Sequence, residues 1–95
     1  MSAPDPLLAG LGEAIRERRD ELGVSQERLG LESGVHRNYI GGIERAERRP
    51  TVVTVAKLAT TLGIRPSELL GKAETRAEQD GASWPPVAQA DRPQQ

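Results

Sequence analysis

The sequence predicts an all-α fold, a compact domain of five helices. Apolar residues three or four positions apart, the spacing of one helical face, recur along the chain from about residue 6 to residue 70. Glycines, prolines and capping Ser, Thr or Asp residues separate these segments. Only 2% of the residues are aromatic, so Leu, Ile and Val must build the core.

The first helix is expected over residues 6–22. Asp5 followed by Pro6 is a favourable helix start, because Asp accepts hydrogen bonds from unpaired N–H groups and proline suits the first helical position. Gly23 is expected to end this helix. The apolar residues expected near its buried face are Leu8, Leu11, Ile15 and Leu22.

Two shorter helices are expected over residues 26–32 and 37–46, meeting at a tight corner. Ser25 is placed to cap the first of them. Gly34 can adopt the positive φ that ends a helix sharply. The second helix presents two apolar residues to the core, Ile40 and Ile43.

A fourth helix, capped by Thr51, is expected to run to about residue 62, followed by a short fifth helix, PSELL, that starts at Pro66. At least one residue of the pair Leu69 and Leu70 is expected to close the core, and a dimer contact is the alternative role. The expected apolar face of the fourth helix is Val52, Val55, Leu58, Ala59 and Leu62.

These helices define a domain over residues 6–72, between a flexible N-terminus (1–5) and a flexible tail (73–95). The tail contains three prolines and the only tryptophan of the sequence, Trp84. The net charge is −1 overall, but segment 36–72 has seven basic and three acidic side chains, a net charge of +4. The basic side chains therefore gather around the second helix of the corner and the loop that follows it.

The composition excludes several classes of protein. There is no cysteine and only one histidine, so neither a disulfide nor a metal centre is expected, and no cofactor or enzymatic activity is indicated. No apolar run is long enough for a signal peptide or a transmembrane helix. We expect a cytoplasmic protein.

Segment 25–45, SQERLGLESGVHRNYIGGIER, resembles the helix-turn-helix of the lambda-repressor/Cro family, also called the xenobiotic response element (XRE) family. The resemblance extends to the flanking segments, from about residue 11 to residue 70. It implies a five-helix domain that binds double-stranded DNA, and a structural ion pair between Arg19 and Glu44. The resemblance rests on Gln26, Leu29, Gly30, Gly34, Val35, Ile40, Ile43 and Glu44.

In a helix-turn-helix the second helix lies in the major groove, and the side chains at its start reach base edges. By position the base-reading candidates are His36, Arg37, Asn38 and, one turn later, Gly42. The resemblance assigns base contacts to Arg37 and Asn38; Arg suits guanine and Asn suits adenine. Family members commonly have a longer side chain at the place of Gly42, so this chain lacks one base contact there.

The expected phosphate contacts come from side chains around that helix. Tyr39 has an equally good alternative role, packing against the helix over residues 26–32. Gly41 and Gly42 cost about 1 kcal/mol each relative to Ala inside a helix, and close approach of DNA or of the neighbouring helix is expected to compensate. The phosphate-contacting candidates are Ser25, Gln26, Tyr39, Arg45, Arg48 and Arg49.

The sequence therefore predicts a dimeric transcriptional regulator that represses or activates by occupying a roughly palindromic operator. Similarity of segment 36–48 to controller proteins of restriction–modification systems suggests one class, and antitoxins are another. The alternative function is a protein-interaction module with weak or no DNA binding, acting through the C-terminal tail or the fifth helix.

Overall fold

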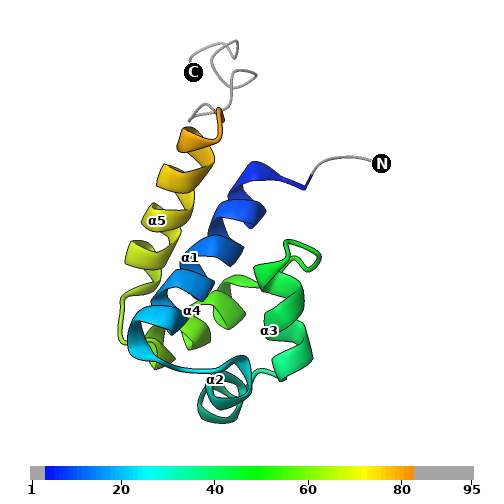
Figure 1. Cartoon of the computed structure of the whole chain (residues 1–95), viewed down its shortest axis with the longest axis vertical. Coiled ribbons are helices and arrows are strands. Elements are labelled where there is room, and N and C mark those ends of the chain that lie inside the picture. The colour runs from blue at the N-terminus through cyan, green and yellow to red at the C-terminus, as the bar shows by residue number, and fades with distance from the viewer. Residues whose placement is uncertain (1–3, 83–95) are drawn as a thin grey trace, which may run out of the picture.

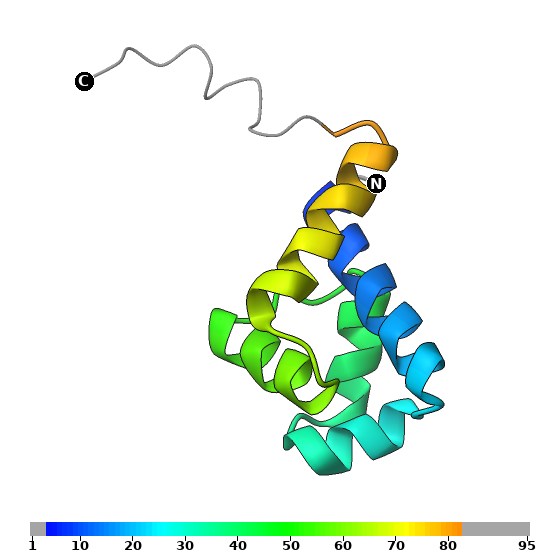
Figure 2. The same cartoon turned by 90° about the vertical axis from the view of Figure 1, so that its left-hand side faces the viewer.

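The computed structural model describes residues 4–82, and this part of the chain folds into five α-helices without strands, as the sequence predicts. The long helices α1 (Pro6–Leu22) and α5 (Pro66–Gln79) run side by side (Figure 1). The shorter helices α2 (Gln26–Ser33), α3 (Arg37–Glu44) and α4 (Val52–Thr61) pack together at one end of this pair. The turned view keeps α5 along α1 and places α2 at the extremity of the molecule (Figure 2).

The capping residues start their helices as the sequence predicts. Asp5 Oδ1 accepts a hydrogen bond from the N–H of Leu7 at 2.8 Å, and Ser25 Oγ accepts one from the N–H of Arg28 at 3.0 Å. Thr51 caps α4 in the same way. Each cap satisfies N–H groups that have no partner within the first helical turn, which fixes where the chain enters the helix.

One apolar core joins all five helices. It contains the expected Leu11 and Ile15, whereas Leu22 and Val52 were wrongly expected there and are 45% and 80% exposed. Leu22 is the last residue of α1 and Val52 is the first residue of α4. The fully buried large side chains are Ile15, Leu29, Ile40, Ile43, Leu58, Leu62 and Leu69.

The fifth helix is longer than predicted, so the expected domain boundary at residue 72 is wrong. α5 continues to Gln79, and Ala73 and Ala77 are fully buried. A Cβ on Gly10 would lie only 2.3 Å from the carbonyl oxygen of Ala73, so α1 approaches α5 closely because both helices have small residues at the crossing. Such a contact gives little apolar signal in the sequence.

Charged side chains join the outer edges of the same two helices. The guanidinium of Arg76 on α5 donates hydrogen bonds to the carboxylates of Glu13 and Glu17 on α1. The bond to Glu17 is the main reason that the pKa of Arg76 is raised. The expectations for residues 83–95, including the role of Trp84, lie outside the described residues.

Candidate nucleic-acid interface

α2 and α3 meet at a tight corner that fixes the start of α3. Gly34, the residue after α2, has a φ of 78°, a conformation that glycine adopts without strain. A Cβ on Gly30 would lie 2.8 Å from the carbonyl oxygen of buried Val35, so the missing side chain permits the close approach. His36 then caps α3, its Nδ1 accepting a hydrogen bond from the N–H of Asn38 at 3.0 Å.

Three of the four base-reading candidates lie together at this exposed helix start: His36, Arg37 and Asn38. Because His36 accepts the capping bond through Nδ1, its Nε2 is left as the ring's N–H donor. Arg37 Nη1 lies 3.3 Å from Oε2 of Glu27 on the first turn of α2. Both side chains of this ion pair are more than half exposed, and the remaining guanidinium N–H groups can serve a ligand.

The fourth candidate, Gly42, is buried, so it is not exposed like the other three. Its position on α3 does face outward, one turn after Asn38. The stem of Arg48 covers it, and a Cβ on Gly42 would lie 2.6 Å from Arg48 Cγ. Gly41 instead faces the side chains of Arg45 and Gln26, so the two glycines accommodate different neighbours.

Two of the six phosphate candidates lie where α2 begins. Ser25 Oγ accepts the capping bond from Arg28, and its O–H remains a donor. The side-chain Nε2 of Gln26 donates to Oε1 of Glu44 at 2.9 Å, so this amide is already engaged within the protein through one of its two N–H groups. Unpaired N–H groups and the helix dipole make such a helix start favourable for phosphate.

The other four phosphate candidates lie on α3 and on the loop after it. The hydroxyl of half-buried Tyr39 donates to the carbonyl oxygen of Arg49 at 3.4 Å, so this ring packs against the loop. The guanidinium carbon of Arg48 lies 5.8 Å from the centroid of the same ring. Arg45 forms an exposed ion pair with Glu47, with 3.2 Å between Nε and Oε1.

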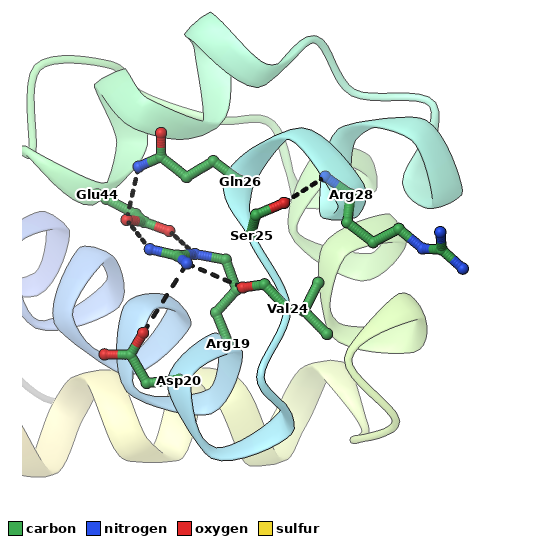
Figure 3. A network of polar contacts seen from close by, with 7 residues as sticks. All are labelled: Arg19, Asp20, Val24, Ser25, Gln26, Arg28 and Glu44. Carbon is green, nitrogen blue, oxygen red and sulfur yellow. Dashed lines mark hydrogen bonds and ion pairs between the residues drawn. The ribbon is translucent and has the colours of Figure 1, made fainter.

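The ion pair implied between Arg19 and Glu44 is present and ties α1 to the end of α3 (Figure 3). Arg19 Nε and Nη2 donate to the two carboxylate oxygens at 2.8 and 3.1 Å, and Nη1 donates to the carbonyl of Val24 at 2.9 Å. With Gln26 bound to the same carboxylate, one network joins α1, α2 and α3.

This network is largely removed from water. The side chains of Arg19 and Glu44 are only 13% and 5% exposed. The hydrogen bond with Glu44 raises the pKa of Arg19, against the opposing effect of burial, and the nearby charges of Glu44 and Asp20 add to the rise. A paired, hydrogen-bonded charge of this kind is costly to break from one side.

Two features of the interface have no local sequence signal. Glu27 is ten residues from Arg37, and only the turn at the corner brings them together. Arg48 covers Gly42 because the loop folds back over α3. The excess of basic residues in segment 36–72 indicated the region but not these contacts.

Other site types are not found in the part of the chain that the structure describes. Residues 4–82 contain no group of three or more His, Asp or Glu side chains that could hold a metal ion. Within the same residues, no helix has both the length and the apolar character that crossing a membrane requires.

Comparison with known proteins gives a consistent result. The helix-turn-helix family model HTH_3 matches residues 15–69. The control protein C.SmaI of Serratia marcescens is 41% identical over 69 residues, which cover 73% of this chain and 82% of that protein. The control protein C.BamHI of Bacillus amyloliquefaciens is 37% identical over 60 residues, covering 62% of this chain and 74% of the relative.

Solved structures agree. The restriction-modification controller protein C.AhdI from Aeromonas hydrophila superposes with a TM-score of 0.64 and 47% identity, covering 65% of this chain and 94% of that one. The controller protein C.Esp1396I, solved as a tetramer with its natural operator, superposes with a TM-score of 0.69 and 28% identity. The match covers 76% of this chain and 95% of that one. This chain belongs to the HTH_3 family of helix-turn-helix DNA-binding proteins and is a transcriptional regulator of the XRE type.

Proposed function

We propose that this regulator binds a specific, roughly palindromic DNA operator as a homodimer. The observation that carries the proposal is the row of exposed polar side chains His36, Arg37 and Asn38 at the start of α3. A helix start of this kind fits the major groove, where Arg reads guanine and Asn reads adenine. The buried Arg19–Glu44 pair holds α3 in a fixed orientation, so the row is preorganised for binding.

Phosphate contacts supply affinity and register. The start of α2, with the Ser25 hydroxyl and the second amide N–H of Gln26, is one candidate site for a phosphate. Arg45 at the end of α3 and Arg49 on the loop that follows it are exposed. Contacts of this kind position the protein on the duplex and contribute little to base choice.

Dimerisation follows from the small size of one reading surface. A single helix-turn-helix reads few base pairs, and two copies about one helical turn apart read enough for useful specificity. The tetrameric operator complex of C.Esp1396I supports an assembly of this type. Leu70 on α5 is the candidate dimer contact, since it is 37% exposed while its neighbour Leu69 is buried.

The relatives named as control proteins favour one class of regulator. C.SmaI, C.BamHI and C.AhdI carry names of control or restriction-modification controller proteins. We therefore propose that this chain controls transcription in a restriction–modification system.

The test starts from a pool of DNA duplexes with a randomised core, from which the purified chain selects its preferred sequence. Fluorescence anisotropy then measures affinity for the recovered duplex, with scrambled duplex as competitor and at two salt concentrations. We expect two related half-sites, binding that survives the competitor, and affinity that falls steeply with salt. Selection of no preferred sequence would refute specific DNA binding and favour a protein-interaction module.

The dimer is tested separately by sedimentation of the chain alone and with the recovered duplex. Two chains on each duplex are expected. A single half-site bound by one chain would refute the palindromic, dimeric part of the proposal and leave sequence-specific binding intact.

A further inference from the structure

The outer face of α3 carries a side chain that does not belong to α3. Asn38 and Gly42 share this face, one helical turn apart. Gly42 has no side chain of its own, yet it is buried, because the stem of Arg48 lies on it. The Cγ, Nε and Cδ atoms of Arg48 are 2.6, 3.5 and 3.6 Å from the place that a Cβ on residue 42 would take.

The turn that ends α3 brings Arg48 there. The N–H of Glu47 donates to the carbonyl of Gly42 at 2.8 Å, and the N–H of Ala46 donates to the carbonyl of Ile43 at 3.0 Å. This is the hydrogen-bond pattern of a Schellman turn, which needs a left-handed residue after the helix. Ala46 supplies it with φ of 60°, although it is not a glycine. The chain therefore reverses and runs back along α3.

Tyr39 holds the returning loop. Its hydroxyl donates to the carbonyl of Arg49, and its ring lies beneath the guanidinium of Arg48. Arginine planes stack favourably on aromatic faces. Arg48 is thus supported at two points, by the bare backbone of Gly42 under its stem and by the Tyr39 ring near its head.

We propose that Arg48 is a third base-reading side chain, seated on Gly42, and that it replaces the side chain which α3 lacks at residue 42. The inference rests on the proposed function and deepens it. The stem of Arg48 lies on Gly42, one helical turn from Asn38, and the guanidinium lies over the ring of Tyr39. The planar fork of N–H donors of an arginine matches the O6 and N7 acceptors of guanine. A contact from Arg48 to phosphate alone is the competing outcome.

The contact between Gly42 and the stem of Arg48 explains why residue 42 is a glycine, although glycine is disfavoured inside a helix. Glycine weakens a helix interior relative to alanine. At residue 42 an alanine methyl would displace the stem of Arg48, so the helical preference of alanine and the position of Arg48 conflict. Gly42→Ala should therefore fold as well as the natural chain while binding DNA with less discrimination.

The experiment compares Gly42→Ala, Arg48→Lys and the double variant with the natural chain, using the duplex that the natural chain selects from the randomised pool. Base preference at every position is measured by competition with single-base-pair substitutions. Lysine keeps the charge that a phosphate needs but loses the two-point fork. Gly71→Ala is the matched control, because it is also a glycine within a helix and a Cβ there meets nothing within 4 Å.

Both single variants should lose discrimination at the same base pair by about five- to hundredfold, the value of one two-point base contact. The double variant should lose no more than Arg48→Lys alone, because both changes remove one contact. Thermal melting checks folding. If Gly42→Ala melts early, Arg48→Lys decides the question, since its exposed side chain is not needed for the core.

Unchanged base preference in Arg48→Lys would overturn the inference and leave Arg48 as a phosphate contact, with sequence-specific binding by Arg37 and Asn38 intact. Loss of base preference in Arg48→Lys but not in Gly42→Ala would refute the role of Gly42 in positioning Arg48. Selection of no sequence by the natural chain would refute the proposed function, and the inference with it.

Discussion

A Cβ placed on Gly12 would lie 2.5 Å from the backbone carbonyl oxygen of Glu44. It would also lie 2.6 Å from the carbonyl oxygen of Ile43, so α1 rests directly on the backbone at the end of α3. This contact leaves no space for a side chain at residue 12. It sets the distance between α1 and α3 that the Arg19–Glu44 pair then spans.

Gly12→Ala should destabilise the fold by about 1–3 kcal/mol, because neither helix backbone can move aside for the added methyl. Gly71→Ala should instead stabilise it by about 0.5–1 kcal/mol, since the methyl meets nothing and alanine favours the helix. Denaturant unfolding of both variants measures the difference. A stabilised Gly12→Ala would contradict the close packing of α1 on α3.

Glu44→Ala should cost up to about 3 kcal/mol, the low end for a buried pair because Arg19 keeps 13% of its side chain exposed. The loss arises because Arg19 and Gln26 lose the acceptor they share. Glu32→Ala is the control: it breaks the exposed pair with Arg28 and should cost less than about 1 kcal/mol. Equal losses in the two variants, by denaturant unfolding, would refute a structural role for the network.

The helix starts could be predicted because each depends on signals within a few residues. Asp5 with Pro6, Ser25 and Thr51 are local caps, and the structure contains each of these bonds. The Arg19–Glu44 pair has no local signal, since 25 residues separate its members, and only the family resemblance indicated it.

The remaining features depend on contacts between small or distant residues. Ala73 and Ala77 are buried because Gly10 lets α1 approach, and alanine gives too weak an apolar pattern to extend the predicted fifth helix. Arg48 covers Gly42 only because Ala46 adopts the left-handed conformation, which alanine does not favour. The sequence could indicate candidate residues for the interface, but it could not predict the contacts of their side chains.

A chain ending at residue 72 should be less stable than the full chain. Two buried methyl groups, those of Ala73 and Ala77, contribute about 0.8 kcal/mol each, so the loss should exceed about 1.5 kcal/mol. A chain ending at Ala82 is the control, because it retains these contacts and those of Arg76 with α1. Thermal melting of the three chains measures the effect. Equal melting of the two shortened chains would mean that the second half of α5 adds nothing.

Arg37→Ala should cost about 1–3 kcal/mol of binding energy on the duplex selected by the natural chain and should relax base choice at one position. Arg45→Ala, as a phosphate candidate, should weaken binding to all sequences alike and lower the salt slope by about 1. Anisotropy titrations on substituted duplexes separate the two patterns. Unchanged base preference in Arg37→Ala would refute base reading by this residue.

Glu27→Gln should strengthen binding to scrambled DNA and thereby reduce discrimination. The Glu27 carboxylate, 3.3 Å from Arg37 Nη1, neutralises part of the positive charge of the proposed DNA-binding face and should repel phosphate. Removing this one exposed charge should change the free energy of binding to scrambled DNA by about 1 kcal/mol, or roughly fivefold in affinity. Glu13→Gln is the matched control, since it makes the same charge change in an exposed pair with Arg76 on the α1–α5 side. If both variants bind scrambled DNA equally, the effect is one of net charge and Glu27 has no special place beside Arg37.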